Sequence, residues 1–139
     1  MSVPPDLRAA YQKALYVVHG APDLVIRIGE RSDDLDDLLD AEGVETAAFL
    51  TAANPNGILQ GKTENELSRA ALHQVLADAG YVCYVGEGRD PEGDWPAEPS
   101  VLALGISRHE SEVIGRSYEQ NAIVFIERGK APELVVLAL

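Results

Sequence analysis

The spacing of apolar residues along the chain switches repeatedly between a helical period and short β-branched runs. Helical spacing of three and four residues predicts amphipathic helices, and apolar runs bounded by Gly, Pro, Asn and Asp predict strands. The pattern predicts helices over residues 4–15, 33–40, 63–79 and 107–120. It predicts strands over residues 16–18, 24–28, 46–51, 81–85, 101–106, 122–127 and 134–139.

Residues with capping chemistry support the starts of three helices. Ser32 is a good N-cap, because its hydroxyl can accept from a free amide of the first turn. Thr63 with Glu66, and Ser107 with Glu110, have the spacing of a capping box. We therefore expect helices to begin directly after Ser32, Thr63 and Ser107.

From residue 46 onward the elements follow the order strand, helix, strand, strand, helix, strand, strand. This order is typical of a split βαβ, ferredoxin-like arrangement with one added strand. We therefore expect a two-layer α+β fold, with a mostly antiparallel sheet, helices on one face, and an N-terminal helix and hairpin added. A three-layer α/β sandwich is the alternative. Residues 1–139 contain no repeat or linker and are expected to form a single domain.

The charge of the chain narrows the classes of partner. Its 23 acidic and 11 basic residues give a formal net charge of −12. Such a field repels phosphate backbones, so we expect no nucleic-acid binding, whereas a basic protein partner would be attracted. The acidic run at residues 33–42 is interpreted as the solvated face of a helix.

No feature of the sequence indicates export, a membrane or a bound metal. Cys83 is the single cysteine, so no internal disulfide can form. The first residues lack the pattern of a signal peptide, and no apolar run approaches the roughly 20 residues of a bilayer span. The histidines have neither H-E-x-x-H spacing nor cysteine partners. We expect a cytoplasmic protein without membrane contact, cofactor or metal.

The segment Gly61-Lys62-Thr63 stands between a predicted strand and a predicted helix, as the end of a phosphate-binding loop does. That loop also needs a glycine five residues before Gly61, where this chain has Asn56. The capping-box spacing of Thr63 gives the segment a simpler use. We interpret it as a turn followed by a helix cap and not as a nucleotide site.

The helix predicted at residues 63–79 carries polar residues where its buried face should continue. Asn65 and Arg69 extend the apolar stripe of that helix toward its N-terminus. Beside them, the Asn-Pro-Asn-Gly sequence at residues 54–57 is a strong turn former. Arg69 would be partly buried there and would need an acceptor. It either holds that turn, pairs with an acid such as Glu98, or belongs to a ligand pocket.

The segment at residues 86–100 is predicted as a long loop. It contains Trp95, the single tryptophan, which could cover a ligand as a lid or fold back onto the sheet. Glu98 enters the following strand and could be a general base or accept from Arg69. Gln120 either closes the last helix or reaches the same region.

Five short segments carry a family resemblance. They are residues 49–55, 64–65, 98–100, 105–107 and 120–125, of which the Thr-Ala-x-Asn-Pro and Glu-Pro-Ser blocks are the most specific. With them the chain resembles, over about residues 11–137, the domain-of-unknown-function family 3293. The resemblance implies a bacterial, stand-alone, single-domain protein, and it brings no known activity, cofactor or catalytic residue. Members often have an aromatic residue where this chain has Ala53, so a stacking contact made there would be lost here.

The family segments contain residues that also stand out on physical grounds. We expect their side chains to share one place in the fold. These residues are Thr51, Asn54, Asn65, Glu98, Ser100 and Gln120.

Three functions fit these residues. The first is a small-molecule or anion-binding module, with its pocket at the turn of residues 54–57 and the following helix N-terminus, lined by Asn65, Arg69 and Glu98 and covered by Trp95. The second is a hydrolase-type enzyme in which Glu98 is the base and Arg69 stabilises charge. The third is an acidic module that binds a basic protein.

Overall fold

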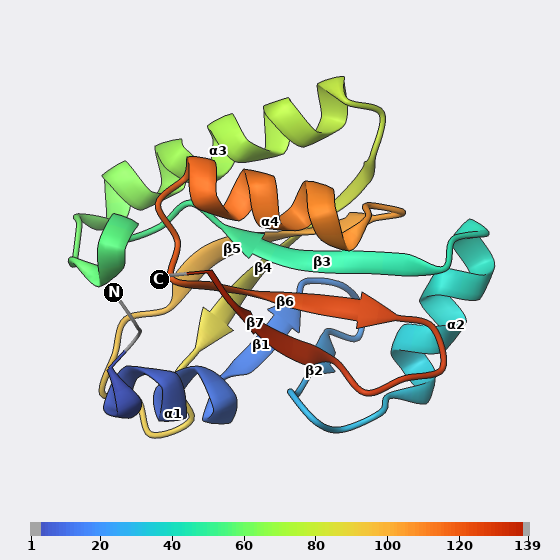
Figure 1. Cartoon of the computed structure of the whole chain (residues 1–139), viewed down its shortest axis with the longest axis horizontal. Helices are drawn as coiled ribbons and strands as arrows, with labels where there is room; N and C mark the ends of the chain where they lie inside the picture. The colour runs from blue at the N-terminus through green and yellow to red at the C-terminus, as the bar shows by residue number, and fades with distance from the viewer. Residues whose placement is uncertain (1–3, 138–139) are drawn as a thin grey trace.

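Residues 4–137 are described by the computed structural model, and they form four α-helices around one seven-stranded sheet (Figure 1). The helices are α1 (Pro5–Lys13), α2 (Asp33–Glu42), α3 (Lys62–Asp78) and α4 (Arg108–Ser117), with a short 3-10 turn η1 (Pro55–Gly57). The strands are β1 (Leu15–Val18), β2 (Leu24–Ile26), β3 (Thr46–Thr51), β4 (Val82–Arg89), β5 (Glu98–Leu104), β6 (Ala122–Glu127) and β7 (Glu133–Val136). None of the helices in this part of the chain is long and apolar enough to cross a membrane.

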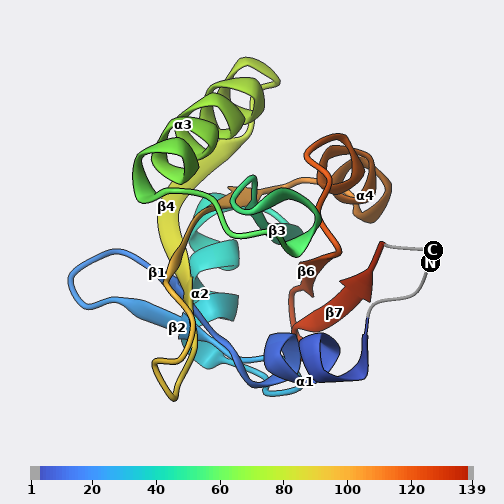
Figure 2. The same ribbon diagram turned by 90° about the vertical axis from the view of Figure 1, so that its left-hand side faces the viewer.

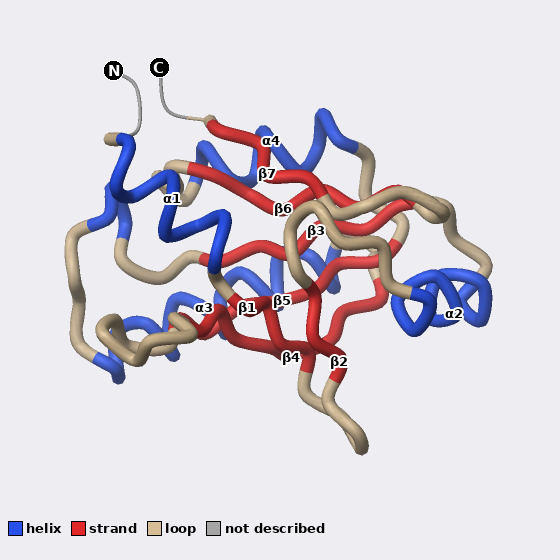
Figure 3. Tube along the Cα trace, turned by 90° about the horizontal axis from the view of Figure 1, so that it is seen from below, coloured by secondary structure: helices blue, strands red, loops and turns tan. Residues whose placement is uncertain are grey.

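The sheet has the strand order β2-β1-β4-β5-β3-β6-β7, and every neighbouring pair is antiparallel. Its central part, β4-β5-β3-β6, is the strand order of a split βαβ plait. The β1–β2 hairpin is added at one end and β7 at the other (Figure 3). The predicted α+β fold, with a ferredoxin-like part beginning near residue 46, is therefore confirmed.

Both faces of the sheet are covered. The helices of the plait, α3 and α4, lie on one face, where Leu72 and Leu76 of α3 are fully buried against β3 and β5. Burial of such a leucine side chain contributes roughly 1.5–3 kcal/mol. The opposite face packs against α2 through Leu35 and Leu39, so the expected placement of helices on one face holds for α3 and α4 and not for α2. Both ends of the sheet bend toward the side on which α1 and α2 lie (Figure 2).

The predicted caps are confirmed at two helices and wrong at the third. The amide of Leu35 donates to Oγ of Ser32, and the amide of Glu110 donates to Oγ of Ser107. At α3 the N-cap is Gly61, no side chain caps it, and the helix begins at Lys62. Thr63 therefore already lies inside the first turn, where its hydroxyl cannot serve as the N-cap acceptor.

The loop predicted at residues 86–100 is shorter in the structure, because β4 continues to Arg89 and β5 begins at Glu98. The Gly-Glu-Gly sequence of β4 lacks the apolar residues that mark a strand. Its glycine at position 86 has a packing role, since a Cβ there would lie 2.3 Å from the carbonyl oxygen of Val17 on β1. The connecting loop is reduced to residues 90–97, and Glu98 is placed on the sheet.

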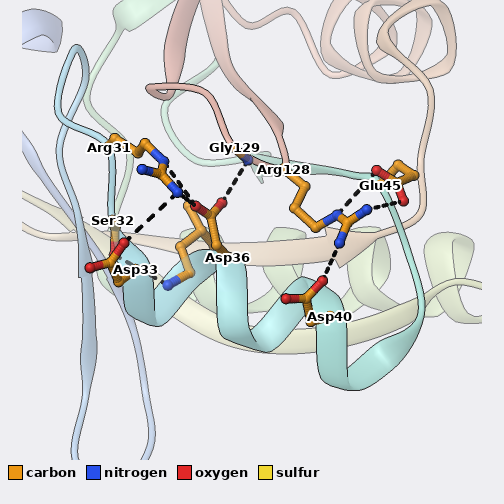
Figure 4. A network of polar contacts seen from close by, with 9 residues as sticks. Arg31, Ser32, Asp33, Asp36, Asp40, Glu45, Arg128 and Gly129 are labelled. Carbon is orange, nitrogen blue, oxygen red and sulfur yellow. Dashed lines mark hydrogen bonds and ion pairs between the residues drawn. The ribbon is translucent and has the colours of Figure 1, made fainter.

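The acidic run at residues 33–42 is not only a solvated face. Asp36 is buried, and its carboxylate accepts from the amide of Gly129 at 2.9 Å and from Nε of Arg31 at 3.2 Å (Figure 4). Arg128 in the same turn pairs with Asp40 and Glu45. These contacts join α2 to the turn between β6 and β7. The prediction of a fully wet face was wrong for Asp36, since it took no account of a chain segment almost a hundred residues away.

Candidate functional site

Asn54 follows β3 in the left-handed backbone conformation, with φ 46° and ψ 61°. Its side chain is buried and uses both of its polar atoms. Oδ1 accepts from Nδ2 of Asn65 at 3.0 Å and from the amide of Gln60 at 2.8 Å. Nδ2 donates to Oε2 of Glu98 at 2.6 Å. The Asn54 amide is therefore fixed from α3 and presented to a carboxylate on β5.

Glu98 begins β5 and is partly buried. Burial raises the pKa of its carboxyl group, and hydrogen bonding from Asn54 and Trp95 offsets part of that rise. No basic side chain of residues 4–137 lies within ion-pair distance of the carboxylate. Glu98 is thus held by neutral donors, which orient the carboxylate without neutralising it.

A cleft of about 410 Å³ opens over Glu98, between α1 and the loop at residues 90–97. We call it the Glu98 cleft. Small apolar side chains of α1 form one wall, and the turn at residues 54–57 contributes to another. The polar and aromatic side chains that line it are Asp6, Tyr11, Tyr16, Asn54, Arg89, Asp90, Asp94, Trp95, Glu98 and Gln120.

Two tyrosines connect α1 to the floor of this cleft. The hydroxyl of Tyr16 donates to the carbonyl oxygen of Tyr11 at 2.6 Å, and Nδ2 of Asn121 donates to the hydroxyl of Tyr11 at 3.3 Å. The ring of Tyr16 packs edge-on against Phe49, with ring centroids 5.4 Å apart. Burial raises the pKa of both phenols, so they are neutral at physiological pH. No residue of α1 itself is buried.

Three of the predicted residues hold the backbone around Asn54 and Glu98. Oγ1 of Thr51 donates to the carbonyl of Pro99 at 2.8 Å and accepts from the amide of Ala53 at 3.0 Å. Oγ of Ser100 donates to the Glu98 carbonyl at 2.8 Å. Nε2 of Gln120 donates to the carbonyl of Ala53 at 2.9 Å and also to the carbonyl of Tyr118, at the end of α4. Gln120 thus fulfils both of its predicted roles.

Arg69 is the predicted residue that the structure places elsewhere. Its Nε lies 3.3 Å from Oε2 of Glu66 on the same helix. It lines a separate cleft of about 540 Å³, together with Lys62 and Asn65. Glu98 does not line this second cleft, and Arg69 does not line the Glu98 cleft, whereas Asn54 lines both. The predicted pairing of Arg69 with Glu98 is wrong, because Glu66 offers a carboxylate one helical turn away.

The remaining predicted residues come together. Asn65 holds Asn54, and Trp95 lines the Glu98 cleft as a residue that is 42% exposed. The loop that carries Trp95 is ordered by Asp90, whose carboxylate accepts from the amides of Glu92 and Asp94. The structure therefore gathers seven of the eight predicted residues around Asn54 and Glu98.

Sequence reasoning missed Tyr11 and Tyr16 as parts of the site. A signal was present, since Tyr11 falls on the apolar face of a predicted helix and Tyr16 begins a predicted strand. Aromatic residues at such positions are usually core residues, so the pattern alone could not assign them to a cleft. Within residues 4–137 there is no cluster of three or more His, Cys, Asp or Glu side chains arranged for a metal ion.

Comparison with protein families gives one match. The family described as Protein of unknown function (DUF3293) matches residues 50–123. The matched part runs from the end of β3 to the start of β6 and contains all eight predicted site residues, whereas Tyr11 and Tyr16 lie outside it. No curated protein and no solved structure matches the chain.

Proposed function

The chain belongs to the DUF3293 family of proteins of unknown function, and we propose that it is a small-molecule-binding domain whose ligand occupies the Glu98 cleft. One observation carries the proposal: a partly buried carboxylate at the floor of a cleft is held by the neutral amide of Asn54. Burying a carboxylate without a cationic partner is costly, and a ligand that donates to it would offset that cost.

The surroundings of Glu98 support this use. A volume of about 410 Å³ falls in the range of small-molecule pockets, roughly 300–1,000 Å³. Asn54 is held by Asn65 and by the amide of Gln60, so the carboxylate is oriented before any ligand arrives. Preorganisation of this kind lowers the ordering cost of binding. Trp95 and Tyr11 add aromatic surface beside a small number of polar groups.

An anionic group does not fit beside Glu98, because like charges repel. The basic side chains Lys62 and Arg69 instead line the second cleft, together with the acids Glu66 and Glu87. Because Arg69 already pairs with Glu66, that cleft does not gather a strong positive charge for an anion either.

A hydrolase is the second candidate function. The raised pKa of Glu98 at a cleft floor suits a general base. Arg69 lines the second cleft and pairs with Glu66, so it is not available to stabilise charge at the Glu98 carboxylate. The candidate therefore depends on Glu98 alone and predicts that Glu98→Gln abolishes any turnover of ester or amide probes.

The test is a screen of small cations, neutral compounds and anions against the purified chain. Trp95 is the single tryptophan and lines the cleft, so its fluorescence reports occupancy directly. Thermal shift measured in parallel gives an independent readout. The variants are Glu98→Gln and, as a matched control, Glu92→Gln, which removes the same charge from an exposed position of the loop that precedes β5.

The proposal predicts compounds that change Trp95 fluorescence saturably and raise the melting temperature. Their affinity should fall at least tenfold in Glu98→Gln and stay unchanged in Glu92→Gln. A screen in which no compound changes Trp95 fluorescence, or in which every binder is indifferent to Glu98→Gln, would overturn the proposal.

A further inference from the structure

We infer that the ligand of the Glu98 cleft carries a protonated amine on a compact apolar body, and that this amine pairs with the Glu98 carboxylate. The inference rests on the proposed function and names the chemical class of the ligand. It follows from the balance of charge in the cleft, from the side chains of its walls, and from the kind of donor that Glu98 lacks.

The charged side chains that line the cleft are predominantly acidic. The lining contains one basic residue, Arg89, and four acidic residues, Asp6, Asp90, Asp94 and Glu98. The guanidinium of Arg89 already donates to Glu87 at 2.8 Å. Its positive charge is therefore paired with a carboxylate that does not line the cleft. The cleft therefore has a negative field that attracts a cation and repels a carboxylate or phosphate.

The walls of the cleft suit a cation attached to a small apolar group. Tyr11, Tyr16 and Trp95 supply aromatic rings, whose faces attract a nearby ammonium group. Leu7 and Ala10 of α1 add a short apolar surface. A compact hydrocarbon body can bury itself there while its charged end reaches Glu98.

Glu98 lacks the partner that an amine would supply. Its carboxylate receives hydrogen bonds from neutral side chains, and burial raises its pKa. A carboxylate has more acceptor sites than these donors fill, and an ammonium group brings three donors together with a positive charge. Charge-assisted bonds of this kind are roughly twice as strong as neutral ones.

Binding of an amine should also be linked to the proton on Glu98. Because the amine favours the ionised carboxylate, affinity should rise with pH across the raised pKa of Glu98 and then level off. The phenols of Tyr11 and Tyr16 are neutral throughout and Arg89 stays charged, so these groups do not reproduce that rise. Asp6 and Asp94 line the cleft as exposed residues, and the carboxylate of Asp90 accepts from the amides of Glu92 and Asp94.

The experiment compares three probes that share one body and differ in their polar end: 2-phenylethylamine, 2-phenylethanol and 3-phenylpropionate. Binding to the full chain is measured by Trp95 fluorescence and by calorimetry, in the wild type, Glu98→Gln and Glu92→Gln. The inference predicts that the amine binds at least tenfold more tightly than the alcohol and that the carboxylate binds more weakly still. This preference should disappear in Glu98→Gln and persist in Glu92→Gln.

If Glu98→Gln does not fold, the wild type alone decides the question. Its affinity for the amine must increase as pH rises from the ordinary glutamate pKa through the raised pKa of Glu98, while its affinity for the alcohol stays constant. Equal or tighter binding of the alcohol or the carboxylate would overturn the inference and leave the proposed function standing. No binding of the amine at millimolar concentration would also overturn the inference. The wider screen described above decides the proposed function separately.

Discussion

Asn54 and Glu98 are 44 residues apart in the sequence, yet Nδ2 of Asn54 lies 2.6 Å from Oε2 of Glu98. The contact joins the end of β3 to the start of β5 across neighbouring strands. The left-handed backbone of Asn54 turns its side chain to this position, a conformation that asparagine adopts more readily than most residues. Nδ2 of Asn65 donates to Oδ1 of Asn54 and so holds the Asn54 side chain in this orientation. The proposed function rests on the contact between Asn54 and Glu98.

The first prediction concerns the stability that Asn54 contributes. Asn54→Ala leaves Glu98, Asn65 and the amide of Gln60 without their partner, and each unpaired buried group costs about 1–3 kcal/mol. Asn56→Ala is the matched control, because Asn56 is also left-handed but exposed. Chemical denaturation should show a loss for Asn54→Ala that exceeds the control by at least about 2 kcal/mol. Equal losses would mean that only backbone strain is involved.

The second prediction concerns pH. The pKa of Glu98 is raised in the folded chain, so the folded state holds this proton more tightly than the unfolded state. Ionisation of Glu98 therefore destabilises the fold as pH rises from the ordinary glutamate pKa through the raised value. Glu98→Gln removes this titration. The free energy of unfolding of the variant minus that of the wild type should increase with pH across that window. A difference that stays flat, or that decreases, contradicts the raised pKa.

The third prediction concerns the close approach of β1 to β4. A Cβ on Gly86 would meet the carbonyl oxygen of Val17 at 2.3 Å and the ring of Phe49 at 3.1 Å. Gly86→Ala should therefore destabilise the chain by at least about 1–3 kcal/mol through overpacking. Gly88→Ala, two residues along the same strand, would meet nothing within 4 Å. Thermal unfolding of the two variants should differ clearly, and similar melting temperatures would show that β1 does not lie so close.

The fourth prediction concerns the acidic helix α2. Asp36→Asn weakens the contacts of a buried carboxylate with Arg31 and the amide of Gly129. Loss of such charge-assisted bonds costs about 1.5–3 kcal/mol. The neighbouring Asp37 is exposed, so Asp37→Asn should change stability by less than about 0.5 kcal/mol. Denaturant titration of both variants gives the comparison, and a large loss in Asp37→Asn would contradict the assignment.

The sequence predicted the central fold well because local and distant preferences agree there. The bounds of β3 and β6 match the prediction, since both are short apolar runs between strong turn formers. Glu98 was expected at the entry to a strand over residues 101–106, but β5 already begins at Glu98. The Glu-Pro-Ser sequence has no strand signal of its own, so the first residues of β5 were missed. Pairing with Gly88 of β4 creates that part of the strand. Such pairing is a tertiary effect that overrides local propensity.

The sequence predicted which residues come together better than it predicted which contacts they make. Asn54, Asn65 and Glu98 stood out as polar residues at the edge of a predicted core, and they meet. The predicted pairing of Arg69 with Glu98 was wrong, because the spacing along the helix places Arg69 on the buried stripe but does not show that its guanidinium reaches Glu66 one turn away. Tyr11 lines the cleft because α1 packs beside it. This packing is a tertiary contact that the local sequence pattern does not predict.

The most direct test of the account is a titration of Trp95 fluorescence with 2-phenylethylamine, in the wild type and in Glu98→Gln. Trp95 is the single tryptophan and lines the cleft, so the signal comes from the proposed site. We expect saturable binding in the wild type that weakens at least tenfold in Glu98→Gln. Binding of equal strength in both proteins, or a fluorescence signal that the amine leaves unchanged in the wild type, would contradict it.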